Sequence, residues 1–280
     1  TYDDKIVAKK LNWKAGAQYQ VNPDVMAYAT VGTGFKGGGF NISTGATVDP
    51  EDLISYELGV KSSWFGNRLV LNAAVFQNDY SDLQVRSVSP TPPVVVVLQN
   101  AASVRARGAE FELIAAPTQE LTLNLGVGYV DSKYQDFKGT RTIFGETIDA
   151  SGNRLPMTPK WTVNAGAQYD QQLAHGGAIV YRGDFAFVSG RYASLDAGQN
   201  LDLFRLPSYA TLNGRVGYRA PGDRWTFTAW MKNITNTQPA VERRHTVQGT
   251  IPMFPGTPLN IQLATYMQPR TYGVTLATEF

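Results

Sequence analysis

The sequence predicts an all-β protein, an antiparallel up-and-down transmembrane β-barrel, and three observations lead to that fold class. Apolar and polar residues alternate over about eleven long segments, and no segment has the period of a convincing helix. The connections between these segments are alternately short and long. The chain also closes on an alternating segment, 269–280, that ends on a phenylalanine. A strand at the very end of a chain needs both a pairing partner and an apolar medium.

Composition agrees with this fold and excludes several others. The 280 residues are 43% hydrophobic and 17% charged, with a mean hydropathy of −0.22. The longest aliphatic run, Val94 to Leu98, is far shorter than the roughly 18–20 residues of a transmembrane helix. A barrel strand exposes only every second residue to lipid, so a polar average is compatible with a barrel. The absence of cysteine excludes disulfides, thiol catalysis and cysteine-ligated metals.

Two further properties concern partners and processing. The net charge of +2 indicates no particular partner and gives no reason to expect nucleic-acid binding. Residues Thr1 to Lys10 lack the apolar core of a signal peptide. We therefore expect that such a peptide has been removed or that the sequence begins within a longer protein.

The alternating segments give eleven expected strands joined by two kinds of connection. Short turns are expected at 22–24, 66–67, 117–120, 174–177 and 221–224. Long loops are expected at about 37–51, 81–101, 135–157, 192–205 and 237–267. Asn213-Gly214 resembles a hairpin signal, but alternation continues through it, so we place it within a strand. Long loops are uncommon in compact soluble domains, and their confinement to one end of a sheet is typical of outer-membrane barrels.

The two faces of these strands differ in chemistry. One face carries charged residues such as Glu57, Arg182 and Arg215, and we expect it to line a water-filled lumen. The other face is apolar and must contact lipid or a second sheet. Aromatic pairs on it lie eight residues apart, which is roughly 20 Å along the membrane normal for a tilted strand. These pairs are Tyr56 and Trp64, Trp161 and Tyr169, and Tyr272 and Phe280. This spacing favours a lipid-facing band with aromatic edges over a sandwich core.

Several stretches, in this order along the chain, resemble the barrel motifs of TonB-dependent outer-membrane receptors. They are Thr-Gly-Phe-Lys-Gly-Gly-Gly-Phe-Asn at 33–41, Ser-Tyr-Glu-Leu-Gly-Val-Lys at 55–61, Gly-Ala-Glu-Phe-Glu at 108–112 and Asn-Ile-Thr-Asn at 233–236. The final strand, ending on Phe280, resembles the terminal strand of outer-membrane barrels, which the barrel assembly machinery reads. Thr278 departs from that pattern, because an apolar residue is commoner at its place.

The resemblance implies a fold, a location and a function. Such receptors lie in the bacterial outer membrane and have a 22-stranded barrel plugged by an N-terminal domain. They import scarce nutrients, most often ferric siderophores, with energy passed on by TonB. We therefore expect residues 1–280 to be the C-terminal part of such a barrel, with the plug, the TonB-contacting box and the first strands absent. Two open edges should prevent this segment from forming a stable barrel alone. No enzymatic activity and no cofactor are expected.

Ligand contacts are expected from the long loops rather than from the strands. Arg243, Arg244 and His245 form a cationic cluster in the longest loop, and guanidinium groups suit the carboxylates or catecholates of a ferric chelate. The same cluster could instead bind lipopolysaccharide phosphates or be only solvated. The complete set of candidate ligand-binding residues is Arg243, Arg244, His245, Phe35, Phe40, Arg191 and Tyr192.

Other motifs carry little weight. Residues 32–37 fit the G-x-G-x-x-G pattern, but no helix follows that could hold a pyrophosphate. The only histidines are His175 and His245, in separate loops, so a zinc site or a Ser-His-Asp site has little support.

Three functional classes remain open from the sequence. Energised import by a receptor is the leading hypothesis, and the ligand could be a ferric siderophore, haem, cobalamin or a glycan. The alternatives are passive diffusion through a porin and a soluble β-sheet binding module. An upstream plug of roughly 130 residues would favour the receptor over the porin, and heat-modifiable mobility of the membrane-extracted protein would exclude the soluble module.

Overall fold

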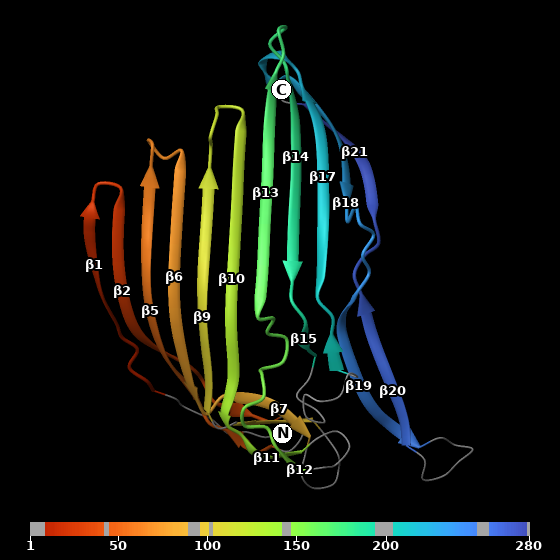
Figure 1. The fold of residues 1–280 in the computed structure, drawn as a ribbon. Helices are drawn as coiled ribbons and strands as arrows, with labels where there is room; N and C mark the ends of the chain where they lie inside the picture. Colours follow the sequence, from red (N-terminus) through yellow and green to blue (C-terminus); the bar gives the residue numbers. More distant parts are fainter. Residues whose placement is uncertain are drawn as a thin grey trace.

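The computed structural model describes residues 9–41, 45–88, 96–100, 103–141, 147–193, 204–250 and 258–278. Eleven strands form one curved antiparallel sheet in chain order (Figure 1). They are β1 (Lys14–Asn22), β2 (Val25–Lys36), β5 (Glu51–Trp64), β6 (Leu69–Ser81), β9 (Ser103–Ala115), β10 (Leu121–Asp136), β13 (Trp161–Gln172), β14 (Ala178–Val188), β17 (Tyr209–Arg219), β18 (Trp225–Lys232) and β21 (Thr271–Thr278). The predicted all-β fold and its eleven up-and-down strands are confirmed.

Five tight turns join these strands at one end of the sheet, at 23–24, 65–68, 116–120, 173–177 and 220–224. In the second of them Phe65, Gly66 and Asn67 all have positive φ, between 56° and 69°, which is why a glycine and an asparagine stand there. The last turn contains a single 3₁₀ turn, η2 (Pro221–Asp223). Within the described ranges, no helix has the length and apolarity needed to cross a bilayer.

The opposite end of the sheet carries the long connections, and each contains a small hairpin that the sequence did not predict. They are β3 (Gly39–Phe40) with β4 (Thr47–Val48), β7 (Gln84–Val88) with β8 (Val96–Asn100), β11 (Lys138–Arg141) with β12 (Thr147–Asp149), β15 (Arg191–Tyr192) with β16 (Arg205–Leu206), and β19 (Ala240–Thr250) with β20 (Pro258–Tyr266). Figure 1 shows the tight turns at one end and these hairpins at the other. The structure therefore confirms that the short turns lie at one end of the sheet and the long connections at the other.

The two faces of the sheet differ as strand parity predicts. On the outer face, defined by residues such as Leu58, Val216 and Val274, large apolar side chains are exposed, with 58%, 48% and 68% of their surface accessible. On the inner face, polar side chains of neighbouring strands bond to one another. The Tyr28 hydroxyl donates to Glu57 Oε1 at 2.7 Å, for example. Apolar side chains outside and a polar network inside reverse the arrangement of a water-soluble protein and suit a lipid-facing wall.

Aromatic pairs mark both ends of the outer face. The rings of Tyr129 and Trp161, near the hairpin end, lie 4.7 Å apart between centroids. Near the tight turns, the rings of Tyr218 and Trp225 lie 5.3 Å apart. Amphipathic rings at the two edges of an apolar band are what membrane interfaces favour. Phe280 lies outside the described residues, so strand β21 is observed only to Thr278.

We predict that Leu212→Arg will destabilise the barrel of the full-length receptor by about 2–4 kcal/mol, because Leu212 lies on the outer face and a cation there must enter hydrocarbon. Thr211→Arg is the matched control, since the adjacent position points to the inner face. Reversible denaturant unfolding in lipid vesicles measures both. Equal destabilisation by the two variants would show that the assignment of the faces is wrong.

Candidate ligand-binding loops and inner wall

The hairpin end of the sheet contains the buried apolar core of the described structure. Val104, Tyr134, Phe137 and Ala150 form a buried cluster with between 0% and 3% of their surface exposed. They come from β9, β10 and the loop that holds β11 and β12. Nearby, Asp149 accepts hydrogen bonds from Ser151, and these bonds hold the pKa of its carboxyl below the usual value. The loops therefore form a packed layer at the hairpin end.

Side-chain hydrogen bonds join two of the hairpins to one another. The Asn41 amide donates to the carbonyl of Leu98 at 3.1 Å. The Asp49 amide donates to Asn100 Oδ1 at 2.8 Å. Gln84 Nε2 also donates to the carbonyl of Gly37 at 2.9 Å. The β3–β4 hairpin is thereby tied to the β7–β8 hairpin, so segments some fifty residues apart act as one unit at this rim.

Phe35 and Phe40, two of the predicted ligand-binding residues, lie beside this unit but in different settings. Phe35 is near the end of β2, and 37% of its surface is exposed. Because it lies four residues after Val31 on the same strand, its side chain points to the same outer face as that of Val31. It therefore belongs to the outer, apolar face. Phe40 is half-buried in β3, opposite Thr47. Of the two, Phe40 lies within the hairpin layer.

Arg191 and Tyr192, in β15, are placed beside the start of the longest hairpin. Arg191 is 7% exposed, and its Nη2 donates to the carbonyl of Val241 at 3.1 Å. Its guanidinium carbon lies 5.8 Å from the ring centroid of Tyr209. Its Nη1 is buried and has no hydrogen-bond partner in the described structure. The carbonyl of Tyr192 accepts a bond from the Met157 amide at 2.7 Å. Arg191 thus links β15 to β19.

The predicted cationic cluster lies on β19. Arg243 is half-buried and pairs with Ala264 in the β19–β20 hairpin. Arg244 and His245 follow it on the same strand, opposite Leu263 and Gln262, and their side chains lie outside the described residues. Arg191 reaches the same strand two residues before Arg243. The structure therefore brings Arg191 and Arg243 into one region of the rim, whereas Phe35 and Phe40 belong to another.

A corner built on Asn233 joins this longest hairpin to the sheet. Asn233 has a φ of 51° and is 6% exposed. Its side-chain amide donates to the carbonyls of Thr237 and Gln268 at 2.9 and 3.0 Å, and its oxygen accepts from the Thr237 amide. Asn213 Oδ1 accepts from the Asn233 amide at 2.9 Å. The Asn-Ile-Thr-Asn stretch thus fastens the end of β18 and the start of β21 to the interior of β17.

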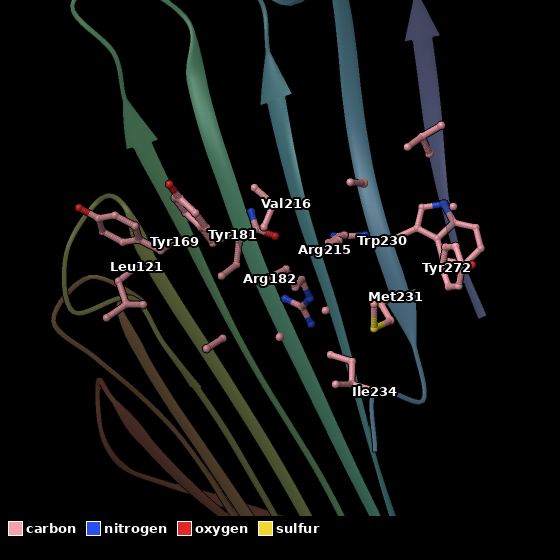
Figure 2. A pocket seen from close by; sticks show the side chains of 17 residues that line it. Leu121, Tyr169, Tyr181, Arg182, Arg215, Val216, Trp230, Met231, Ile234 and Tyr272 are labelled. Carbon is pink, nitrogen blue, oxygen red and sulfur yellow. The ribbon is translucent and has the colours of Figure 1, made fainter. Parts of the chain in front are cut away.

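Several hollows occur in the described part of the wall, and residue-type patterns gave no signal for them. One of them, of about 860 Å³, lies against the outer face of β13, β14, β17, β18 and β21 (Figure 2). Its outward positions include Tyr169, Tyr181, Val216 and Tyr272. Gly183 contributes to its depth, because a Cβ there would have no atom within 4 Å. This hollow faces the apolar medium, and the outward positions named above carry tyrosine and valine rather than Asp, Glu, Lys or Arg.

Another hollow, of about 570 Å³, involves the inner face of β14, β17, β18 and β21. Its inner-face side chains are Asp184, Asn213, Arg215, Thr228, Trp230, Lys232 and Thr275. We call it the inner-wall pocket. Within the described part of the chain, no group of three or more His, Asp or Glu residues could hold a metal ion. The inner-wall pocket itself is lined by charged, polar and aromatic side chains.

Comparison with known proteins identifies the family. A model of the TonB dependent receptor-like β-barrel matches residues 1–234. The chain belongs to this family. As a TonB-dependent receptor barrel it lies in the outer membrane of bacteria and is not an enzyme. The predicted transmembrane β-barrel and its predicted location in the bacterial outer membrane are thereby confirmed.

The relatives of this TonB-dependent receptor barrel include several curated siderophore receptors. The metal-pseudopaline receptor CntO of Pseudomonas aeruginosa is 28% identical over 206 residues, which cover 71% of this chain and 26% of the relative. The ferric-pyoverdine receptor PbuA of Pseudomonas sp. strain M114 is 26% identical over 219 residues, which cover 76% and 24%. The chain therefore spans about a quarter of the length of these relatives.

Solved structures agree on the fold. The ferric yersiniabactin uptake receptor FyuA of Yersinia pestis has a TM-score of 0.74 at 22% identity, covering 95% of this chain and 37% of that one. The siderophore receptor PiuA of Acinetobacter baumannii has a TM-score of 0.70 at 18% identity, with coverages of 95% and 35%. At such identities the likeness concerns the fold alone.

We predict that Arg191→Ala will loosen the β15–β16 hairpin from β19, because it removes the bond to the Val241 carbonyl and the contact with Tyr209. Hydrogen exchange of the peptides around 191 and 241 in the full-length receptor should show protection lower by about 1–3 kcal/mol. Arg191→Lys keeps the charge but not the guanidinium, and should lose most of the same protection. Wild-type exchange in Arg191→Ala would contradict this structural role.

Proposed function

We propose that this chain is the C-terminal barrel part of a receptor that imports a scarce nutrient, a ferric siderophore, across the outer membrane. The observation that carries the proposal is its similarity over most of its length to curated siderophore receptors, including CntO at 28% identity. The rim of packed hairpins provides a surface for ligand capture at the end where the long connections gather. Rigid strands with recognition in the loops are the usual division of labour in such scaffolds.

The partners follow from this function. TonB would supply the energy through an N-terminal plug, and the barrel assembly machinery would read the terminal segment that ends on Phe280. Lipopolysaccharide would surround the outer leaflet of the wall. The capture surface would include Tyr192 and Arg243 at the rim, where the buried Arg191 links β15 to β19. Arg244, His245 and Phe40 would be further contacts.

Uptake by the full-length receptor, produced in a host without receptors of this kind, tests the function. The probes are radiolabelled ferric citrate, a ferric tris-catecholate and ferrioxamine B, with haem and cobalamin as competitors. Import of an iron complex that stops when TonB is deleted would support the proposal. Uptake that does not depend on TonB would indicate a passive porin. Uptake of haem or cobalamin alone would show that one of these, and not a ferric siderophore, is the substrate.

We predict that the double substitution Arg243→Gln and Arg244→Gln will weaken binding of an imported anionic iron complex by about 1–3 kcal/mol, because charge-assisted hydrogen bonds are lost. Equilibrium binding to cells that carry the full-length receptor measures the loss. Arg224→Gln, which removes an exposed cation at the tight-turn end, is the control. An unchanged affinity with normal barrel assembly would remove Arg243 and Arg244 from the capture surface.

A further inference from the structure

Strands β6, β9 and β10 extend past the aromatic edge of the outer face at the hairpin end. Tyr129 and Trp161 mark this edge, and the three strands continue beyond the level at which β13 begins (Figure 1). Beyond the edge, charged and amide side chains replace apolar ones on the outer face. We call them the outer belt, and they are Gln77 and Asp79 on β6, Arg105 and Arg107 on β9, Asp131 and Lys133 on β10, and Lys160, which precedes β13.

The alternation of burial shows that the outer belt points away from the lumen. Val104 and Tyr134 are 1% and 3% exposed, because they pack under the hairpin layer on the inner face. The adjacent residues Arg105 and Lys133 expose 39% and 42% of their side chains. Neighbours along a strand point to opposite faces. The outer belt therefore continues the outer face of the wall toward the hairpin end.

Both carboxylates of the outer belt are held in ion pairs. Asp79 Oδ1 lies 2.5 Å from Arg105 Nε. Asp131 pairs with two cations at once, since its Oδ2 lies 3.1 Å from Lys133 Nζ and its Oδ1 lies 3.4 Å from Lys160 Nζ. Each carboxylate can offset only one positive charge. The Asp131 group therefore keeps a net positive charge.

Arg107 adds a further positive charge to the outer belt. It is exposed, and its Nε donates to Gln77 Oε1 at 2.8 Å, which fixes the start of the guanidinium group without neutralising it. Within the described ranges, Arg107 forms no ion pair. Arg107 and Asp131 are directly opposite one another in the register of β9 and β10. The excess cations thus lie on neighbouring strands, close enough for one anionic group to meet both.

The outer belt lies at the level of the lipid headgroups. On a strand tilted by about 40°, two residues rise about 5 Å along the membrane normal and four residues rise about 10 Å. Asp131 and Lys133 follow the edge residue Tyr129 by these two steps. The polar layer outside the hydrocarbon is roughly 5–8 Å deep on each side of a bilayer. Because long connections lie on the external side of outer-membrane barrels, this layer belongs to the external leaflet.

We propose that the outer belt is a binding site for the phosphate groups of lipopolysaccharide, the anionic glycolipid of the external leaflet, and that Arg107 and Lys133 bind them. A guanidinium fork matches two phosphate oxygens, and an ammonium group adds a compact positive charge beside it. The proposal concerns the lipid-facing surface only. It does not depend on the cargo or on the lumen.

A lipid held at this place supports the part of the wall that carries the hairpin layer. Arg105 and Lys133 alternate along β9 and β10 with Val104 and Tyr134, which belong to the buried cluster on the inner face. A glycolipid bound outside and packed hairpins inside thus act on the same strand ends. Binding to the folded state alone also stabilises that state by mass action.

Lipid binding to the purified full-length receptor tests the proposal. The probes are bis-phosphorylated lipid A, lipid A without phosphate groups, and phosphatidylglycerol, each titrated into the receptor in a non-ionic detergent. Native mass spectrometry counts the bound lipids, and heat-modifiable mobility gives the folded fraction. The variants are Arg107→Gln, Arg107→Lys, and the double substitution Arg107→Gln with Lys133→Gln. Arg224→Gln, which removes an exposed cation at the tight-turn end, is the matched control.

We expect the double variant to bind bis-phosphorylated lipid A at least about tenfold more weakly than the wild type, because two charge-assisted contacts are lost. Arg107→Gln should fall between them, and Arg107→Lys should retain more binding than Arg107→Gln. Arg224→Gln should bind like the wild type. The lipid should also raise the temperature at which the wild type loses its folded mobility, and this rise should be absent in the double variant.

Three results would overturn the proposal. Equal binding by the wild type and the double variant would remove Arg107 and Lys133 from the site. Equal binding of lipid A with and without phosphate would show that the acyl chains alone are recognised. Equal binding of phosphatidylglycerol would make the outer belt a surface for any anionic lipid. If the double variant does not fold, Arg107→Gln decides the question, since Arg107 closes no ion pair among the described residues. Iron uptake is measured separately, so the proposed import function stands or falls independently of these results.

Discussion

The structure depends on one constraint: the backbone of a wall that crosses a membrane must satisfy its hydrogen bonds within the sheet, because lipid offers no partner. Extended pairing gives each side chain to one of two faces in strict alternation. The apolar band with Leu58 and Val274 and the polar network with Glu57 are therefore two results of the same ladder. A slip of one residue in any strand would exchange them.

This constraint explains why so much of the fold could be predicted from the sequence. A period of two is visible in residues without knowledge of their neighbours, and the segment around Tyr56 and Glu57 shows it clearly. Tight turns carry local chemistry as well, as in Asn22-Pro23-Asp24 and Gly66-Asn67. Even the placement of Gly214 within a strand followed from alternation alone. The wall is predictable because the interactions that define it are regular and local in sequence.

The rim and the pockets could not be predicted because their contacts join distant segments. Nothing around Arg191 in the sequence indicates that its guanidinium is buried against Val241, fifty residues away. Trp230 and Gly273 fit together only because register places β18 beside β21. The candidate residues were chosen for charge and aromatic character, and these properties do not distinguish a buried link such as Arg191 from a side chain that meets a ligand.

The corner at Asn233 separates two parts of the chain whose amino-acid sequences can evolve at different rates. On one side of it, β18 and β21 are held in the register of the wall. On the other side, β19 and β20 pair only with each other in the described structure. Because the corner closes the strand ends with its own hydrogen bonds, a hairpin of different length or sequence can be joined there without shifting any wall residue. The β19–β20 hairpin can therefore be replaced during evolution as one unit. Receptors that differ in this hairpin can differ in ligand specificity while the barrel wall stays the same.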